Sequence, residues 1–267
     1  MSPLLRNILF IIAVTPSIAV GQPEFPFQPK ETVRYEVVYN VGFLWLNAAK
    51  VTFEVSEKIY QDKPVFRFVS IGTTNPNYDW FFTVRDTFIS YADRNDLRSY
   101  FASRNTLEGS YRVNDLLFFD TKSGIITANL YNNRQGKRQK HLKPKNPAMD
   151  VLTAVYFCRT LDYSYLNLDQ IVPIHTIIDD SVYSLYIRYK GREELQMPDG
   201  KKYKTHKISV KLVEGTIFRS GEDMHVWFTD DLVKIPLLVD AKILIGSVKA
   251  YLLSTEHLKF PIEAGPY

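Results

Sequence analysis

The chain has 267 residues, of which 45% are hydrophobic and 23% charged, as is ordinary for a soluble globular protein. Its net charge of +4 is mild and far from that of a nucleic-acid-binding domain, so we predict no nucleic-acid partner. The length allows one large β domain or two smaller ones. Aromatic residues make up 14% of the chain and lie mainly in segments with the pattern of β-strands.

The first 21 residues have the pattern of a secretory signal peptide. Arg6 precedes an apolar run over residues 8–14, and small residues follow at Ala19 and Gly21. We predict cleavage after Gly21 and export to the periplasm or to the outside of the cell. The run is about half as long as the roughly 20 residues of a spanning helix. We therefore predict no transmembrane segment in the mature chain, with an N-terminal membrane anchor as the alternative.

Residues 31–145 have the pattern of an antiparallel meander. Val33, Tyr35 and Val37 alternate with polar residues, and the same alternation returns over residues 49–56. Five further strands are predicted over residues 65–71, 80–91, 97–106, 111–119 and 125–131. Short polar turns separate them, whereas parallel strands need long crossovers, so the pairing is predicted to be antiparallel.

The connection at residues 42–47 is unusually apolar, since it contains Phe43, Leu44, Trp45 and Leu46. We predict that it is tucked under the sheet, and a contact surface is the alternative.

A basic run covers residues 134–145 and contains no aromatic residue on which bases could stack. We predict a solvated strand pair or loop, and contact with an anionic envelope surface would be its best functional use.

One long helix is predicted over residues 147–161. Asn146 is a favoured N-cap, Pro147 suits the first helical position, and Asp150 suits the first turn. Apolar residues recur at helical spacing at Val151, Leu152, Val155, Tyr156, Cys158 and Leu161. We expect this helix to separate two β-rich halves, about 31–145 and 163–260, and to pack against or plug a concave sheet.

The second half is also predicted to be rich in strands. Residues 171–178 and 181–190 are joined at Asp179-Asp180, and residues 198–200 form a hairpin turn. Apolar residues then occupy alternate positions over 235–245, and the phase changes at Gly246. We interpret this change as a β-bulge or a sharp corner in one long bent strand. Residues 22–267 are thus predicted to form a single mainly β domain. Its core would be a curved antiparallel sheet or barrel-like meander with one long helix between the two β-rich halves.

The sequence contains no hydrolase elbow, nucleotide-binding loop or zinc-binding helix motif. We predict no catalytic residue, no metal site and no cofactor. Cys158 is the one cysteine, so no internal disulfide is available, and a buried inert thiol is expected. His206 lies on the apolar face of its strand and is expected to be a core histidine. The acid pairs at 179–180, 193–194 and 230–231 fit turns or opposite strand faces better than an acid/base couple.

The three tryptophans are the candidate ligand-binding residues. Trp45, Trp80 and Trp227 could line a ligand cavity, and core packing is the alternative.

Three segments resemble an exported bacterial family. They are Y-E-V-V-Y-N-V-G-F-L at residues 35–44, A-M-D-V-L-T-A-V-Y-F-C-R at 148–159, and V-W-F-T-D-D-L-V-K-I-P-L-L-V-D-A-K-I-L-I-G-S-V-K-A-Y-L at 226–252. The family is the one catalogued as domain of unknown function 3108. The resemblance implies a β-rich exported or envelope protein and brings no activity or catalytic residues.

The favoured hypothesis is a non-catalytic module of the cell envelope that binds an apolar or lipid-like ligand or another envelope protein. The alternatives are an exported hydrolase of an envelope polymer or polysaccharide, and a structural module for protein interaction.

Overall fold

The computed structural model of the chain describes residues 24–41, 44–78, 83–213, 221–243 and 246–266. The predicted signal peptide and Trp80 lie outside the described residues.

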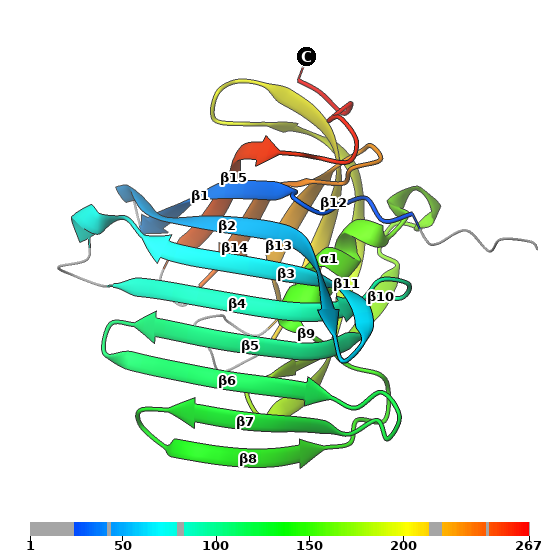
Figure 1. Cartoon of the computed structure of the whole chain (residues 1–267). Helices are drawn as coiled ribbons and strands as arrows, with labels where there is room; N and C mark the ends of the chain where they lie inside the picture. Colours follow the sequence, from blue (N-terminus) through cyan, green and yellow to red (C-terminus); the bar gives the residue numbers. More distant parts are fainter. Residues whose placement is uncertain (1–23, 42–43, 79–82, 214–220, 244–245, 267) are drawn as a thin grey trace, which may run out of the picture.

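Within the described ranges, fifteen strands form one continuous sheet, which Figure 1 shows. Those of the first half are β1 (Thr32–Val41), β2 (Leu44–Tyr60), β3 (Lys63–Thr74), β4 (Val84–Asp93), β5 (Ser99–Glu108), β6 (Tyr111–Phe119), β7 (Ile126–Asn132) and β8 (Gly136–Leu142). Those of the second half are β9 (Met149–Asp150), β10 (Ile171–Ile178), β11 (Ser181–Gln196), β12 (Lys202–Leu212), β13 (Gly221–Thr229), β14 (Pro236–Lys242) and β15 (Ser247–Glu256).

The sheet runs in the order β8 to β1 and then β15 to β9, so the first and last strands are neighbours. Successive strands pair directly along each half, so each half is a meander apart from β9 and β10, which a helical segment separates. Every pair of strands is antiparallel except the short β9–β10 pair. The predicted mainly β, antiparallel fold is confirmed.

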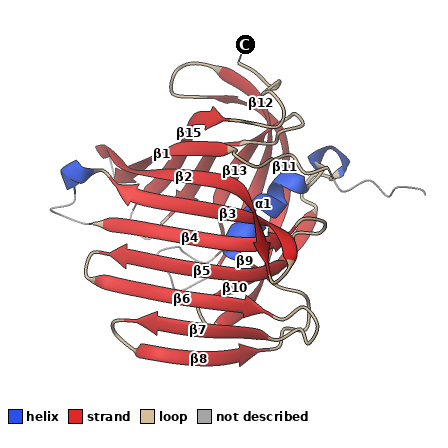
Figure 2. Cartoon of the chain, in the orientation of Figure 1, coloured by secondary structure: helices blue, strands red, loops and turns tan. Residues whose placement is uncertain are grey.

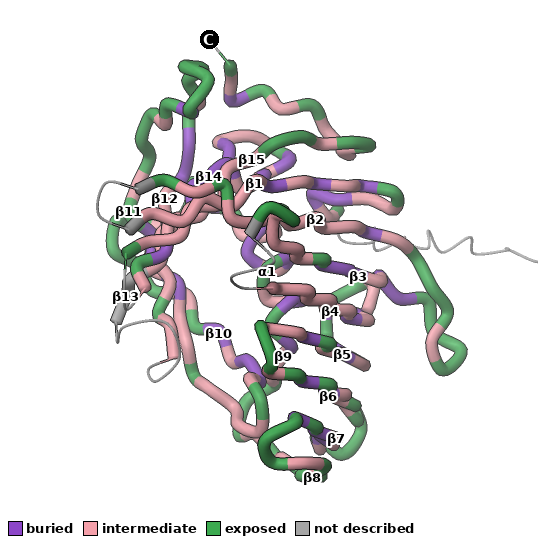
Figure 3. Tube along the Cα trace, turned by 90° about the vertical axis from the view of Figure 1, so that its left-hand side faces the viewer, coloured by how far each residue is buried: buried purple, intermediate pink, exposed green. Residues whose placement is uncertain are grey.

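The sheet curls around α1 (Val151–Thr160), which is the one α-helix in the part of the chain that the structure describes. Figure 2 shows the strands surrounding this helix, and Figure 3 shows strands of the two halves on either side of it. Two 3₁₀ turns, η1 (Pro76–Tyr78) and η2 (Tyr163–Tyr165), complete the regular structure of the described residues. Within those residues, no helix has the length and apolar character needed to cross a bilayer.

Opposite sides of α1 bury against the two halves of the sheet, as expected. Leu152 and Tyr156 join a core cluster with Phe66 and Phe68 of β3, and the rings of Phe68 and Tyr156 stack with centroids 3.8 Å apart. Cys158 joins the second cluster, which is built from β10–β13. The helix therefore fills one part of the concavity and links both halves through their apolar faces.

The helix begins later than the sequence pattern predicts. Asp150, not Asn146, is the N-cap, and its carboxylate accepts a hydrogen bond from the Thr153 backbone N–H at 3.0 Å. Met149 and Asp150 pair with β10 as the short strand β9, which holds the chain extended up to the cap. The prediction failed because this pairing with a distant strand overrides the local capping signal at Asn146-Pro147.

The predicted bent strand around Gly246 is a hairpin. β14 ends at Lys242 and β15 begins at Ser247, and these two residues face each other across the antiparallel pair. The Ile243 N–H donates to the Gly246 carbonyl at 3.2 Å, and Gly246 has a φ of +83°. The phase change therefore marks a turn, for which a glycine with positive φ is suited, and not a bulge.

The apolar connection after β1 is shorter than predicted, because β2 already begins at Leu44. Trp45 is 57% exposed, so the expectation that this residue is tucked under the sheet is wrong. Gly42 and Phe43 lie outside the described residues.

Candidate functional site

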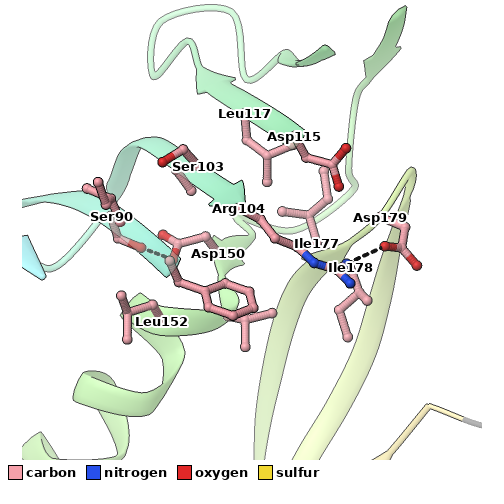
Figure 4. A pocket seen from close by; sticks show the side chains of 14 residues that line it. Ser90, Ser103, Arg104, Asp115, Leu117, Asp150, Leu152, Ile177, Ile178 and Asp179 are labelled. Carbon is pink, nitrogen blue, oxygen red and sulfur yellow. Dashed lines mark hydrogen bonds and ion pairs between the residues drawn. The ribbon is translucent and has the colours of Figure 1, made fainter. Parts of the chain in front are cut away.

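A cavity of about 70 Å³ lies between the N-terminus of α1, strands β4–β6 and the end of β10 (Figure 4). Its polar lining residues are Ser90, Ser103, Arg104, Asp115, Asp150 and Asp179. The remaining walls are apolar, with Phe88, Leu117, Leu152 and Ile177 among them. A dry cavity of about 150 Å³ holds one benzene molecule. The present cavity is therefore large enough for water or for one end of a ligand, but not for a whole lipid.

Asp150 lines this cavity, and both oxygens of its carboxylate accept hydrogen bonds. Its carboxylate accepts from the Ser90 hydroxyl, from the Ser99 hydroxyl at 2.6 Å and from the Thr153 hydroxyl at 2.6 Å, in addition to the capping N–H. Asp150 is only 3% exposed. Because both oxygens are occupied, Asp150 ties β4 and β5 to the start of α1. The Ser90 and Ser99 hydroxyls donate to a carboxylate, and the residues that line the cavity include no histidine to pair with a serine.

Charged side chains continue from the cavity along the inner face of β4–β6. Arg104 stands opposite Asp115 in the β5–β6 pair, and Asp86 stands opposite Thr106 in the β4–β5 pair. Burial raises the pKa of Asp86 to about 6, and the nearby Glu108 adds to this shift. Burial also raises the pKa of Asp115, whose carboxylate accepts from the Tyr131 N–H at 3.2 Å. This part of the concave face is a charged wall.

The turn between β10 and β11 reaches across to this wall. Arg104 Nη1 donates to Asp179 Oδ1 at 2.8 Å, and Lys140 Nζ of β8 lies 2.6 Å from Asp180 Oδ2. Asp179-Asp180 is a turn, as predicted, and its carboxylates also bind cations of the first half. Sequence reasoning missed this pairing, because nothing local relates an acidic turn to basic residues far earlier in the chain.

Comparison with known proteins places the chain in a family. A family model described as protein of unknown function (DUF3108) matches residues 34–253, which is most of the chain. The chain belongs to the DUF3108 family. No curated protein matches it. A crystal structure of a beta-barrel-like protein of domain of unknown function DUF1849 from Brucella abortus is similar with a TM-score of 0.53 and 9% identity. The alignment covers 86% of this chain and 98% of that one, and it shows a shared fold alone.

In this DUF3108 member the described tryptophans do not meet at the cavity. Val226 packs in the cluster around Cys158, so its neighbour Trp227 points to the convex face, where it is 7% exposed and donates to Glu193. Trp45 lies opposite Asn40, and the ammonium of Lys249 lies 5.7 Å from its ring centroid. The predicted role of the tryptophans in ligand binding stays a prediction.

The other two residues singled out from the sequence behave as core residues. His206 is 4% exposed, and its ring nitrogens contact the Tyr189 hydroxyl at 2.9 Å and Asp230 Oδ1 at 2.7 Å. Burial lowers the pKa of His206, although Asp230 opposes the shift. Burial raises the pKa of the Cys158 thiol to about 12, which disfavours the reactive thiolate. The predictions of a satisfied core histidine and a buried thiol are confirmed.

Proposed function

We propose that this protein is an exported, non-catalytic module of the cell envelope that binds an amphipathic, lipid-like ligand in the concavity of its sheet. The single observation that carries the proposal is the division of the inner face into an apolar wall and a charged wall.

The apolar wall follows from strand register. Residues directly opposite one another in a sheet share a face. One row across strands β13, β14, β15, β1 and β2 reads Val226, Val239, Ala250, Val37 and Ala49. The next row reads Met224, Ala241, Val248, Tyr39 and Leu46. Val226 packs in the cluster with Cys158 of α1, so both rows lie on the inner face.

Most of these side chains are half-buried, unlike the fully buried core next to α1. Val37, Val239, Val248 and Ala250 all keep part of their surface exposed. Burying apolar surface contributes roughly 25 cal/mol per Å², so a ligand chain that covers these rows would gain free energy. This wall supports the apolar part of the proposed ligand.

The charged wall supports a polar end. Asp86, Arg104 and Asp115 lie on the same inner face, on strands β4–β6. Because the sheet is continuous and curls around α1, the inner faces of the strands that carry the two walls turn toward the helix (Figure 3). A ligand with an apolar chain and a polar group would match both walls, whereas a simple hydrocarbon would offer no polar group to the charged wall.

The test is binding of a naturally fluorescent fatty acid, cis-parinaric acid, to the mature chain with matched variants of neighbouring residues. Val37→Asn places an amide on the inner face, whereas Val38→Asn changes the adjacent residue, which points to the convex face opposite Lys249. An amide buried against an apolar chain without a partner costs roughly 1–3 kcal/mol, so Val37→Asn should weaken binding about tenfold or more.

The Val38→Asn variant should bind as tightly as the parent protein. Equal affinities for all three proteins, or no binding at all, would refute the proposal. Native mass spectrometry of the protein purified from its host's envelope would then identify the ligand class through any molecule that co-purifies at fixed stoichiometry.

A further inference from the structure

Positive charge is concentrated at one edge of the sheet. Between Asp120 and Asp150 the chain has no acidic residue and seven basic residues: Lys122, Arg134, Lys137, Arg138, Lys140, Lys143 and Lys145. The whole chain has a formal charge of +4, so the remainder has a formal charge of −3. We call these seven residues, on β8 and the segments around it, the basic edge. Its charge is opposite in sign to that of the rest of the protein.

Most of this charge is available to a partner. Arg138 and Lys140 pair with Asp180, and the Arg134 guanidinium lies 4.6 Å from the Tyr111 ring centroid. The other four cations are exposed and make no ion pair with any described residue: Lys122, Lys137, Lys143 and Lys145. Like charges gathered in this way repel one another, and an anionic partner would relieve that repulsion.

Aromatic rings lead across the convex face to the same edge. The ring centroids of Tyr60, Tyr91, Phe101 and Phe118 lie 5.1, 5.0 and 5.5 Å apart in succession. Phe118 is 36% exposed, and Tyr131 of β7 is 37% exposed directly opposite Lys137. The exposed ring of Tyr131 therefore lies beside the unpaired Lys137, on the same face of the sheet as Phe118.

We propose that the basic edge, together with Phe118 and Tyr131, docks the protein on an anionic phospholipid surface. Lysine side chains near such a surface are attracted to the lipid phosphates. Aromatic side chains are favoured at the level of the headgroups, between the apolar acyl chains and the water. Long lysine stems also allow the ammonium to reach the phosphates while the sheet edge stays at the surface. The proposal concerns the convex face and does not depend on a ligand in the concavity.

Two other partners fit the surface less well. A single-stranded nucleic acid stacks its bases on free ring faces. Here successive rings from Tyr91 to Phe118 are in contact and are tilted by 34° and 60° relative to one another, so they do not form a row of parallel ring faces. Lysines on an edge strand also protect it from pairing with another chain. That role explains Lys137 within β8, but not Lys122, Lys143 and Lys145, which lie outside any strand.

The experiment is co-sedimentation of the mature chain with vesicles of pure phosphatidylcholine, and with vesicles of equal parts phosphatidylcholine and phosphatidylglycerol. The edge variant is K137Q/K143Q/K145Q. The matched control K50Q/K211Q/K242Q removes the same charge from exposed lysines elsewhere. Each lysine near an anionic bilayer changes the partition coefficient by about fivefold, so the edge variant should bind about a hundredfold more weakly. F118S tests the aromatic part and should also weaken binding.

The proposal predicts sedimentation with the anionic vesicles alone, lost at high salt, weakened in the edge variant and kept in the control. No sedimentation with anionic vesicles would overturn it. So would equal losses in both triple variants, which would assign binding to net charge. Tighter binding of single-stranded RNA than of anionic vesicles would assign the edge to nucleic acid instead. An edge variant that self-associates but still sediments with vesicles would assign the lysines to edge protection.

Discussion

Lys140 and Asp180 join β8, at one edge of the sheet, to the β10–β11 turn near the other edge through a contact of 2.6 Å. Arg104 and Asp179 form a second contact of 2.8 Å beside it. Together these pairs hold the turn against the charged wall, so the two ends of the sheet are linked by charge in addition to the helix between them.

Removing both carboxylates should loosen this link. We expect D179N/D180N to lower the free energy of unfolding by about 1 kcal/mol at low salt, and by roughly half as much at high salt, because exposed ion pairs are weak and screened. Lys140 holds the pKa of Asp180 below its usual value. The ion pair therefore contributes its full stability at pH values above the usual pKa of an aspartate, and this stability is lost as the pH falls through the lowered pKa of Asp180. Urea unfolding at two salt concentrations measures the effect. D199N, which breaks only a local pair with Lys201, is the control.

The buried pair between Arg159 and Glu31 should matter far more. Arg159 lies at the end of α1, is 3% exposed, and also donates to the carbonyls of Pro26 and Val233. R159M leaves the Glu31 carboxylate buried without its partner, so we expect a loss of about 3–5 kcal/mol in denaturant unfolding. The double variant R159M/E31M should recover part of that loss. R34M, which breaks the exposed pair with Glu256, should cost less than about 1 kcal/mol. Equal effects of R159M and R34M would contradict this account.

Asp150 should be needed for the start of the helix. D150A removes the N-cap and leaves the buried hydroxyls of Ser99 and Thr153 without their acceptor. We expect a loss of about 2–4 kcal/mol, of which capping accounts for about 1 and the stranded donors for the rest. The control D162A removes the exposed cap of η2 and should have a much smaller effect. Circular dichroism with thermal unfolding compares the two variants.

Asp86 should make the protein less stable as the pH rises. Its pKa is raised to about 6 in the folded protein, above the ordinary value of 3.8. Between those two values the folded state holds a proton that the unfolded state has lost, so its contribution to stability falls with rising pH through this window. D86N cannot ionise at this position. The free energy of unfolding of D86N minus that of the parent should therefore be larger at pH 8 than at pH 4, by on the order of 1–3 kcal/mol. The control is D62N, which makes the same substitution in an exposed turn.

Local patterns in the sequence determined much of this protein. The alternation of Val33, Tyr35 and Val37 placed an inner face on β1, and short polar turns made the pairing antiparallel. Backbone geometry and the partition of side chains between core and water act over a few residues, so such features can be predicted without knowing the fold. The buried states of Cys158 and His206 followed from the same local patterns.

Contacts between distant segments decided the rest, and only the tertiary structure shows them. The pairing of β1 with β15, the short strand that moves the helix cap to Asp150, and the ion pairs of Asp179 and Asp180 all join residues far apart in the chain. Their free energies depend on how the curved sheet brings these segments together, and a local pattern carries no information about that distance. For the same reason the sequence pointed to tryptophans as binding residues, whereas the two walls of the concave face were visible only once the register of the strands was known.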